Sequence, residues 1–172
     1  MQRSTLFTAA AGVLLAAGCA IPMAGAAPSS ASSSPAPSSS SASESRIFDL
    51  INRQRQRQGL KPLVFNRELD RMAKIQAENM ARFQKMAHTI PDASLPTLSD
   101  RARYVGYGYS RLAENVALGY PNAETVVEGW MNSRGHRQNI LDAGVVETGI
   151  GIARSSAGGI YYCQVFGRQL SF

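Results

Sequence analysis

A stretch of low sequence complexity divides this chain and limits where a fold can form. Between Pro28 and Ser43 nearly every residue is Ser, Ala or Pro. Such a segment has no apolar surface to bury, so it cannot offset the entropy that a chain loses when it becomes ordered. We therefore expect residues 28–43 to be a disordered linker. The residues that follow, 44–172, are enough for one domain and too few for two ordinary ones.

The segment before the linker has the order of an export signal. Arg3 supplies a positive charge, and an apolar run extends from Leu6 to Ala17. This run is too short to span a bilayer as a helix, which takes about 20 apolar residues. A short charged, apolar and small-residue sequence is typical of a signal peptide, which we place at residues 1–27.

The end of this signal, from Leu14 to Cys19, resembles a bacterial lipobox, the motif in which the cysteine is lipidated and becomes the mature N-terminus. Two interpretations stay open. In the first, which we prefer because Cys163 is the only other cysteine, Cys19 anchors a lipoprotein to the membrane of the bacterial cell envelope. In the second, cleavage at Ala24-Gly25-Ala26 discards Cys19 and the domain is secreted. Both predict an exported protein.

The chain is basic, with a formal net charge of +6. Several arginines alternate with glutamines near residues 53–57, a pattern more typical of a solvated helix face than of a nucleic-acid site. We expect no nucleic-acid partner and a mild attraction to anionic lipid or envelope polymer. With Cys163 alone, the domain has no internal disulfide, and we expect this side chain to be a buried small hydrophobe.

Hydrophobic periodicity predicts helices early in the domain and a strand hairpin late, an order that favours the α+β class. Asn66 and Asn122 are the expected caps of two of the helices. A glycine-bearing turn at residues 155–159 indicates that the last two strands pair antiparallel. The expected helices cover residues 45–58, 66–84, 100–104 and a segment after 122, and the expected strands cover residues 112–118, 145–153 and 160–166.

Four segments carry residues of chemical interest. They are His88-Thr89, Glu114-Asn115-Val116-Ala117, the block from Trp130 to Leu141, and Gln164-Val165-Phe166-Gly167. Their identity, order and spacing closely resemble the CAP superfamily, also called the SCP-like or "cysteine-rich secretory, antigen 5, pathogenesis-related 1" domain, in its bacterial branch. The resemblance covers nearly all of residues 44–172. It implies an α+β fold, a three-layer α-β-α sandwich with a small antiparallel sheet.

The resemblance also implies a groove that collects two histidines and acidic residues. It assigns the histidines to His88 and His136 and the first acid to Glu114. Ser133 stands where animal and plant members carry a second Glu, and Ala113 replaces the Gly of their Gly-Glu-Asn motif. The predicted groove residues are thus His88, Glu114, His136 and Ser133, with His88 and His136 as the metal ligands if a metal binds.

Two interpretations of this set remain. Two imidazoles and a carboxylate suit a first shell for Zn²⁺, in which Glu114, the one candidate catalytic residue, would be the general base of a metal-dependent hydrolase. Alternatively, a buried Glu114 bridges the histidines and pins helices to the sheet. Ser133 lies three residues before His136, but no Gly-x-Ser-x-Gly elbow occurs, so we expect Ser133 to form hydrogen bonds at a helix end.

We prefer a non-enzymatic binding module to a hydrolase, because the second acid of the groove is missing. Its expected partner is a small amphipathic or lipid ligand, or a divalent metal, bound in the groove of His88, Glu114 and His136. Lipidation of Cys19 would add the membrane as a partner. Zn²⁺ is the one cofactor that these residues suggest.

Overall fold

The computed structural model of the chain describes residues 39–171. The predicted signal peptide, Cys19 and residues 28–38 of the predicted linker lie outside the described residues. Residues 39–43 were expected to end the linker, but they form the first turns of helix α1 (Ser39–Arg57). The hydroxyl of Ser45 donates to the carbonyl of Ser41 at 2.9 Å, a local bond that a helix allows Ser to make.

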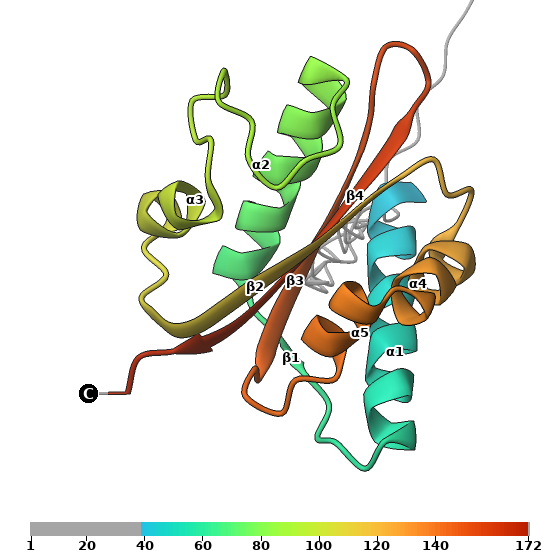
Figure 1. The fold of residues 1–172 in the computed structure, drawn as a ribbon, viewed down its shortest axis with the longest axis vertical. Coiled ribbons are helices and arrows are strands. Elements are labelled where there is room, and N and C mark those ends of the chain that lie inside the picture. The colour runs from blue at the N-terminus through green and yellow to red at the C-terminus, as the bar shows by residue number, and fades with distance from the viewer. Residues whose placement is uncertain (1–38, 172) are drawn as a thin grey trace, which may run out of the picture. The chain divides into compact units, whose positions relative to one another are not determined.

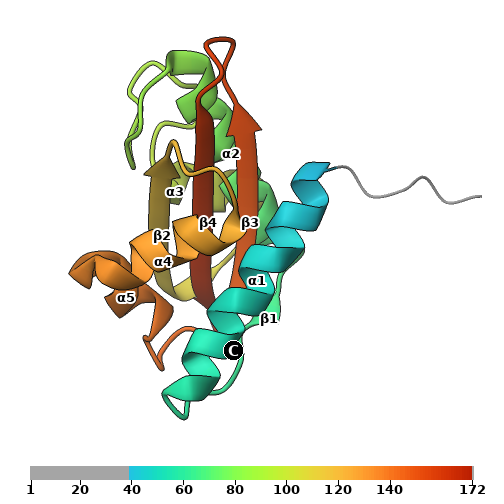
Figure 2. The ribbon, with the colours of Figure 1, turned by 90° about the vertical axis from the view of Figure 1, so that its right-hand side faces the viewer.

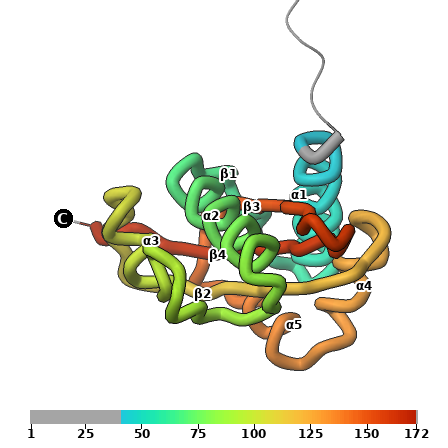
Figure 3. Tube along the Cα trace, turned by 90° about the horizontal axis from the view of Figure 1, so that it is seen from above, coloured from blue at the N-terminus to red at the C-terminus, as the bar shows by residue number. Residues whose placement is uncertain are grey.

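Within residues 39–171, five helices and four strands form three layers, which confirms the predicted α+β sandwich. Figures 1 and 3 show α2 and α3 on one side of the sheet and α1 and α4 on the other, with α5 beside α4 near β2. The remaining elements are β1 (Val64–Phe65), α2 (Arg67–Phe83), α3 (Leu98–Val105), β2 (Tyr109–Leu118), α4 (Ala123–Asn132), α5 (Arg134–Ile140), β3 (Glu147–Arg154) and β4 (Ile160–Gln169).

The sheet has the strand order β1-β3-β4-β2. Strands β3 and β4 form the predicted antiparallel hairpin, and β2 pairs antiparallel with β4 so that Glu114 lies opposite Val165. Strand β1 is two residues long and runs parallel to β3. The sequence did not indicate β1, because two residues are too few to show an alternating pattern. Strand β2 is therefore the edge of the sheet that carries Glu114.

Helix α2 packs directly on the sheet because two glycines leave room for it. Asn66 caps the helix as predicted, its side chain accepting the Leu69 N–H at 2.9 Å. On β3, a Cβ at Gly149 would collide with the backbone at Asp70, and one at Gly151 would collide with the helix backbone one turn further on. Glycine at both positions therefore allows the backbone of α2 to lie close to β3.

Two cores lie on the two faces of the sheet. The first joins α2 and α3 to residues such as Cys163, which is fully buried as predicted. The second joins α1 and α4 to residues such as Trp130, which is 1% exposed. The segment that follows Ser133 is helix α5. Among residues 39–171, no helix has the length and apolar character needed to cross a membrane.

Candidate functional site

The carboxylate of Glu114 lies inside the protein on the α2–α3 face of β2, with its side chain 2% exposed. One oxygen, Oε1, lies 2.9 Å from Nδ1 of His88. The other, Oε2, accepts a hydrogen bond from Nη2 of Arg101 and one at 3.4 Å from the thiol of Cys163. Burial, and then the charge of Glu114, raise the pKa of Cys163 well above its usual range, so this thiol remains a donor. Both carboxylate oxygens therefore have partners within the protein.

Arg101 is the charge partner of Glu114, and nothing in the sequence marked it. Its side chain on α3 is fully buried, and its Nη1 donates to Oε1 of Gln76 on α2. Gln76 in turn donates to the carbonyl of Ala87, just before His88. Because a guanidinium stays protonated in proteins, the buried pair of Arg101 and Glu114 is an ion pair. We name Gln76, His88, Arg101, Glu114 and Cys163 the Glu114 cluster.

His88 is the exposed end of this cluster. It follows α2, and its side chain is 58% exposed although Nδ1 is held by the buried carboxylate. The hydrogen bond to Glu114 raises the pKa of His88 above its ordinary value. In the neutral ring, Nδ1–H donates to the carboxylate and Nε2 carries the free lone pair. The structure thus joins His88 and Glu114, two of the residues that the resemblance assigns to the groove.

His136 approaches the same edge of the sheet from the other face. It lies on α5, and burial, followed by the charge of His88, lowers the pKa of His136. Within residues 39–171, however, no hydrogen bond joins His136 to Glu114, and the His136 carbonyl accepts from the side chain of Asn115 at 3.1 Å. A shared groove for His88, Glu114, His136 and Ser133 stays a prediction.

Ser133 stands at the junction of two helices, ending α4 and beginning α5. Its backbone N–H donates to the carbonyl of Trp130 at 3.2 Å, and its own carbonyl accepts the N–H of Arg137 at 2.9 Å. Its side chain makes no capping hydrogen bond to α5. Ser133 therefore has the predicted position at a helix end, but the backbone, rather than the hydroxyl, forms the bonds that join the two helices.

The block from Trp130 to Leu141 covers the exposed edge of β2. The indole N–H of Trp130 donates to the carbonyl of Val116 at 3.3 Å. Asn139 donates to the carbonyl of Glu114 at 3.3 Å and to the side-chain oxygen of Asn115 at 2.9 Å. An edge strand otherwise presents unpaired carbonyls that can template aggregation. This block, one of the four segments that carry the resemblance, docks α4 and α5 onto the edge strand.

The donor set does not fit a resident zinc centre. A catalytic zinc takes three protein ligands and leaves one position open. Here Glu114 has both oxygens occupied, and within residues 39–171 no group of three or more His, Cys, Asp or Glu side chains is arranged to hold a metal ion. Glu147, an acid at the start of β3, belongs to a separate group. It accepts hydrogen bonds from the hydroxyl of Tyr107 at 2.7 Å and the amide of Asn66 at 3.1 Å.

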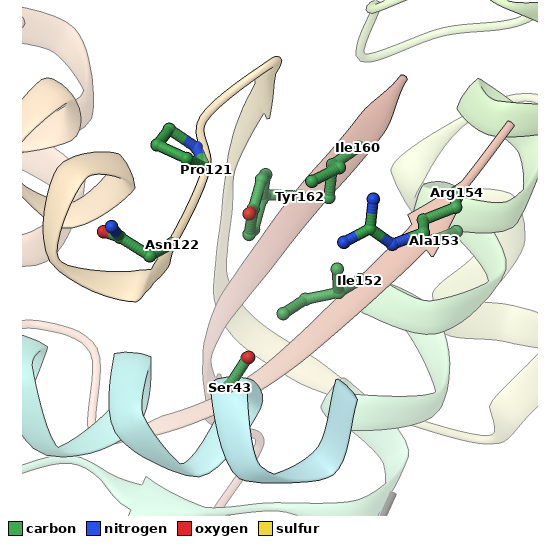
Figure 4. Close-up of a pocket in the computed structure, with 8 residues that line it drawn as sticks. All are labelled: Ser43, Pro121, Asn122, Ile152, Ala153, Arg154, Ile160 and Tyr162. Atoms are coloured by element: carbon green, nitrogen blue, oxygen red, sulfur yellow. The ribbon is translucent and has the colours of Figure 1, made fainter. Parts of the chain in front are cut away.

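A hollow of about 420 Å³ lies on the opposite face of the sheet (Figure 4). We name it the α1–α4 hollow, because Ser43 of α1 and the residues that begin α4 border it. Figure 4 shows the guanidinium of Arg154 reaching between Ile152 and Ile160. The hydroxyl of Tyr162 is already bonded to the carbonyl of Tyr120 at 2.8 Å. The lining residues are Ser43, Pro121, Asn122, Ile152, Ala153, Arg154, Ile160 and Tyr162.

The α1–α4 hollow combines an apolar floor with the cation of Arg154 and with the polar residues Ser43 and Asn122. Its size falls within the range of about 300–1,000 Å³ that small-molecule sites occupy. Arg154 is exposed and forms no salt bridge with a described acid. Sequence analysis missed this site, because its residues come from distant elements and none belongs to a recognisable motif.

Comparisons with known proteins agree with this architecture. The model of the family described as "CAP: Cysteine-rich secretory protein family" matches residues 48–166. YkwD of Bacillus subtilis is 36% identical over 127 residues, which are 74% of this chain and 48% of YkwD. An extracellular protein of Bacillus anthracis that contains an SCP domain is 28% identical, with a TM-score of 0.69 over 76% of this chain and 41% of that one.

An outer surface protein of Borrelia burgdorferi shares the fold at 19% identity, with a TM-score of 0.66 over 72% of this chain and 90% of that protein. The described chain spans about half the length of the two Bacillus relatives, or less. Their remaining parts have no counterpart in this match.

Proposed function

Because this chain belongs to the CAP family of cysteine-rich secretory proteins, we propose that it acts outside the cytoplasm as a non-enzymatic module that binds a small amphipathic molecule in the α1–α4 hollow. The predicted signal peptide supports export. So do the family members and structural relatives that are themselves extracellular or outer surface proteins. The lipid anchor on Cys19 is part of the same proposal.

The contacts of Glu114 argue against a hydrolase. A general base must present a free oxygen within hydrogen-bond reach of the proton that it removes. Glu114 has one oxygen on His88 and the other on Arg101, and its side chain is 2% exposed. A cluster with these contacts orients His88 and ties α2, α3 and β2 together. The contacts of Glu114 therefore support an architectural role at this edge of the sheet rather than a reaction.

The shape and chemistry of the α1–α4 hollow carry the binding proposal. Ile152, Ile160 and Tyr162 offer apolar surface, which favours an alkyl or ring system. Arg154 reaches over that surface and can pair with an anionic head. The proposed ligand is thus a single-chain amphipath with a carboxylate head, in which the tail lies against the isoleucines.

Calorimetric titration of the full chain with dodecanoate, kept below its micelle concentration, tests this proposal. We expect one saturable site. Ile152→Glu places a like charge on the apolar floor and should abolish binding of dodecanoate. Arg154→Gln should weaken it about fivefold, because an exposed ion pair contributes roughly 1 kcal/mol.

Two controls sharpen the result. Arg154→Gln should leave the affinity for dodecanol unchanged, since the alcohol has no charge to pair. Arg103→Gln removes a charge from an exposed side chain on α3, on the other face of the sheet, and should leave both affinities unchanged. An absence of saturable dodecanoate binding, or full binding by Ile152→Glu, would refute the proposed site.

A further inference from the structure

A second hollow, of about 490 Å³, lies on the outer side of α4 and α5 and is separate from both sites above. It is lined by Met131, Asn132, Arg134, Arg137, Gln138 and Leu141. Met131 and Leu141 are partly buried against the second core and leave part of their apolar surface exposed. The lining includes no acidic residue. We name these six residues the α5 outer surface.

The two arginines of this surface are exposed and lack an acidic partner in the described part of the chain. They lie three residues apart on α5, where like charges repel each other across one helical turn. Some other exposed arginines do have an acidic partner, as Arg46 has Glu124, Arg103 has Asp100, and Arg111 has Asp142. Others form no salt bridge with a described acid, and these include Arg53, Arg57 and Arg154. Intramolecular contacts therefore do not account for the charge at Arg134 and Arg137.

One side of helix α5 contacts β2, and another side lines the second hollow. Asn139 and the backbone of His136 bind β2, as described above. Arg134, Arg137 and Leu141 follow one another at helical spacing on another side and line the hollow. Figure 2 shows α5 as the outermost element on the β2 side of the sheet. The side that holds the fold is covered, and the side with the unpaired charges is open to solvent.

We propose that the α5 outer surface docks on an anionic phospholipid bilayer. Paired basic side chains beside shallow apolar groups match the interface of such a bilayer, where phosphates attract arginine and short apolar side chains insert below the head groups. The inference rests on the proposed export, which brings the domain to the envelope membrane. A lipid on Cys19, if the cysteine is processed as proposed, would hold the domain near that membrane.

The test is a vesicle-binding titration of the full chain with Cys19→Ser, so that no acyl chain contributes. We expect binding to phosphatidylglycerol vesicles, no binding to phosphatidylcholine vesicles, and strong weakening by salt. The double variant R134Q/R137Q should bind phosphatidylglycerol about 25-fold more weakly, because each arginine at an anionic surface contributes roughly fivefold. R53Q/R57Q removes the same charge from exposed positions of α1 and should bind within twofold of the parent.

Equal losses in the two double variants would overturn the proposal, because net charge rather than this surface would then drive binding. Retained binding by R134Q/R137Q would overturn it as well. So would soluble polyphosphate that binds as tightly as the vesicles at equal phosphate, which would identify a soluble polyanion as the partner. Dodecanoate titration of R134Q/R137Q keeps the proposals distinct, since we expect its affinity to be unchanged whatever the vesicles show.

Discussion

The Glu114 cluster and the α1–α4 hollow lie on opposite faces of one sheet and differ in what their polar groups contact. In the cluster, Arg101 and Gln76 are fully buried and hydrogen-bonded within the protein. Both carboxylate oxygens of Glu114 are also hydrogen-bonded to residues of the cluster. In the hollow, the exposed Arg154 lies over apolar side chains with no ion pair to a described acid. Glu114 and His88, which the sequence singled out as candidate functional residues, are therefore bonded to each other within the fold.

This difference separates structural ionisable groups from groups that can bind a ligand. A buried charge is kept because its partner is buried with it, and the removal of either leaves an uncompensated charge. An exposed charge beside an apolar hollow contributes little to folding and remains available to a partner. Variants of the cluster should therefore change stability, and variants of the hollow should change binding.

The largest expected effect comes from Glu114→Gln, which leaves the Arg101 guanidinium buried without its countercharge. We expect the free energy of unfolding to fall by about 3–5 kcal/mol, measured by urea denaturation. Glu128→Gln, at an exposed position of α4, should change it by less than about 0.5 kcal/mol. The double variant R101M/E114M should recover part of the loss. A cost below about 1 kcal/mol for Glu114→Gln would contradict the ion-pair account.

A smaller effect is expected where α5 meets the edge strand. Asn139→Ala removes the donor to the Glu114 carbonyl and to the Asn115 side chain. We expect a loss of about 1–3 kcal/mol in the same denaturation experiment, since these acceptors would be left without their partner. Its neighbour Gln138 is exposed, and Gln138→Ala should be nearly neutral. Equal effects of the two substitutions would show that the edge bonds do not hold α5.

The smallest effects are the opposite pH dependences of the two histidines. The pKa of His88 is raised, so its bond to Glu114 stabilises the fold below about pH 6.5 and loses that effect as pH rises through its folded pKa. The pKa of His136 is lowered, so the fold gains from its neutral ring above about pH 6.5 and loses that gain as pH falls through its folded pKa. Both rings are partly exposed, and each contribution should stay below about 1 kcal/mol.

Stability curves of His88→Gln and His136→Gln between pH 5 and 8 measure these contributions. His88→Gln should lose most relative to the parent at acid pH, and His136→Gln should lose most at alkaline pH. Proton NMR titration of the parent should give a pKa above 6.5 for His88 and one below it for His136. The reverse order of the two pKa values would contradict the contact between Glu114 and His88.

The fold was largely predictable from local patterns. Apolar periodicity and the cap residues Asn66 and Asn122 gave α2 and α4, and the glycine turn gave the hairpin. Strand β1 and helix α5 were missed, because two residues show no periodicity and α5 has only seven residues. The room that Gly149 gives to α2 could not be foreseen, since it depends on packing between distant segments.

The candidate site was predictable only through the resemblance. That resemblance named His88, Glu114 and His136, and the structure joins the first two directly. Arg101 escaped notice because an arginine in a short charged helix is usually exposed, and its burial follows from the position of α3 against Glu114. The α1–α4 hollow has no linear signature at all, because three separate segments and one helix end form it.

The most direct test of the central claim is dodecanoate titration of the double variant H88Q/H136Q alongside Ile152→Glu. If the histidines serve the edge of the sheet and the hollow binds the ligand, H88Q/H136Q should keep its affinity within about twofold while Ile152→Glu shows no saturable heat. A tenfold or greater loss in H88Q/H136Q, with Ile152→Glu binding normally, would place the ligand at the histidines and contradict the account.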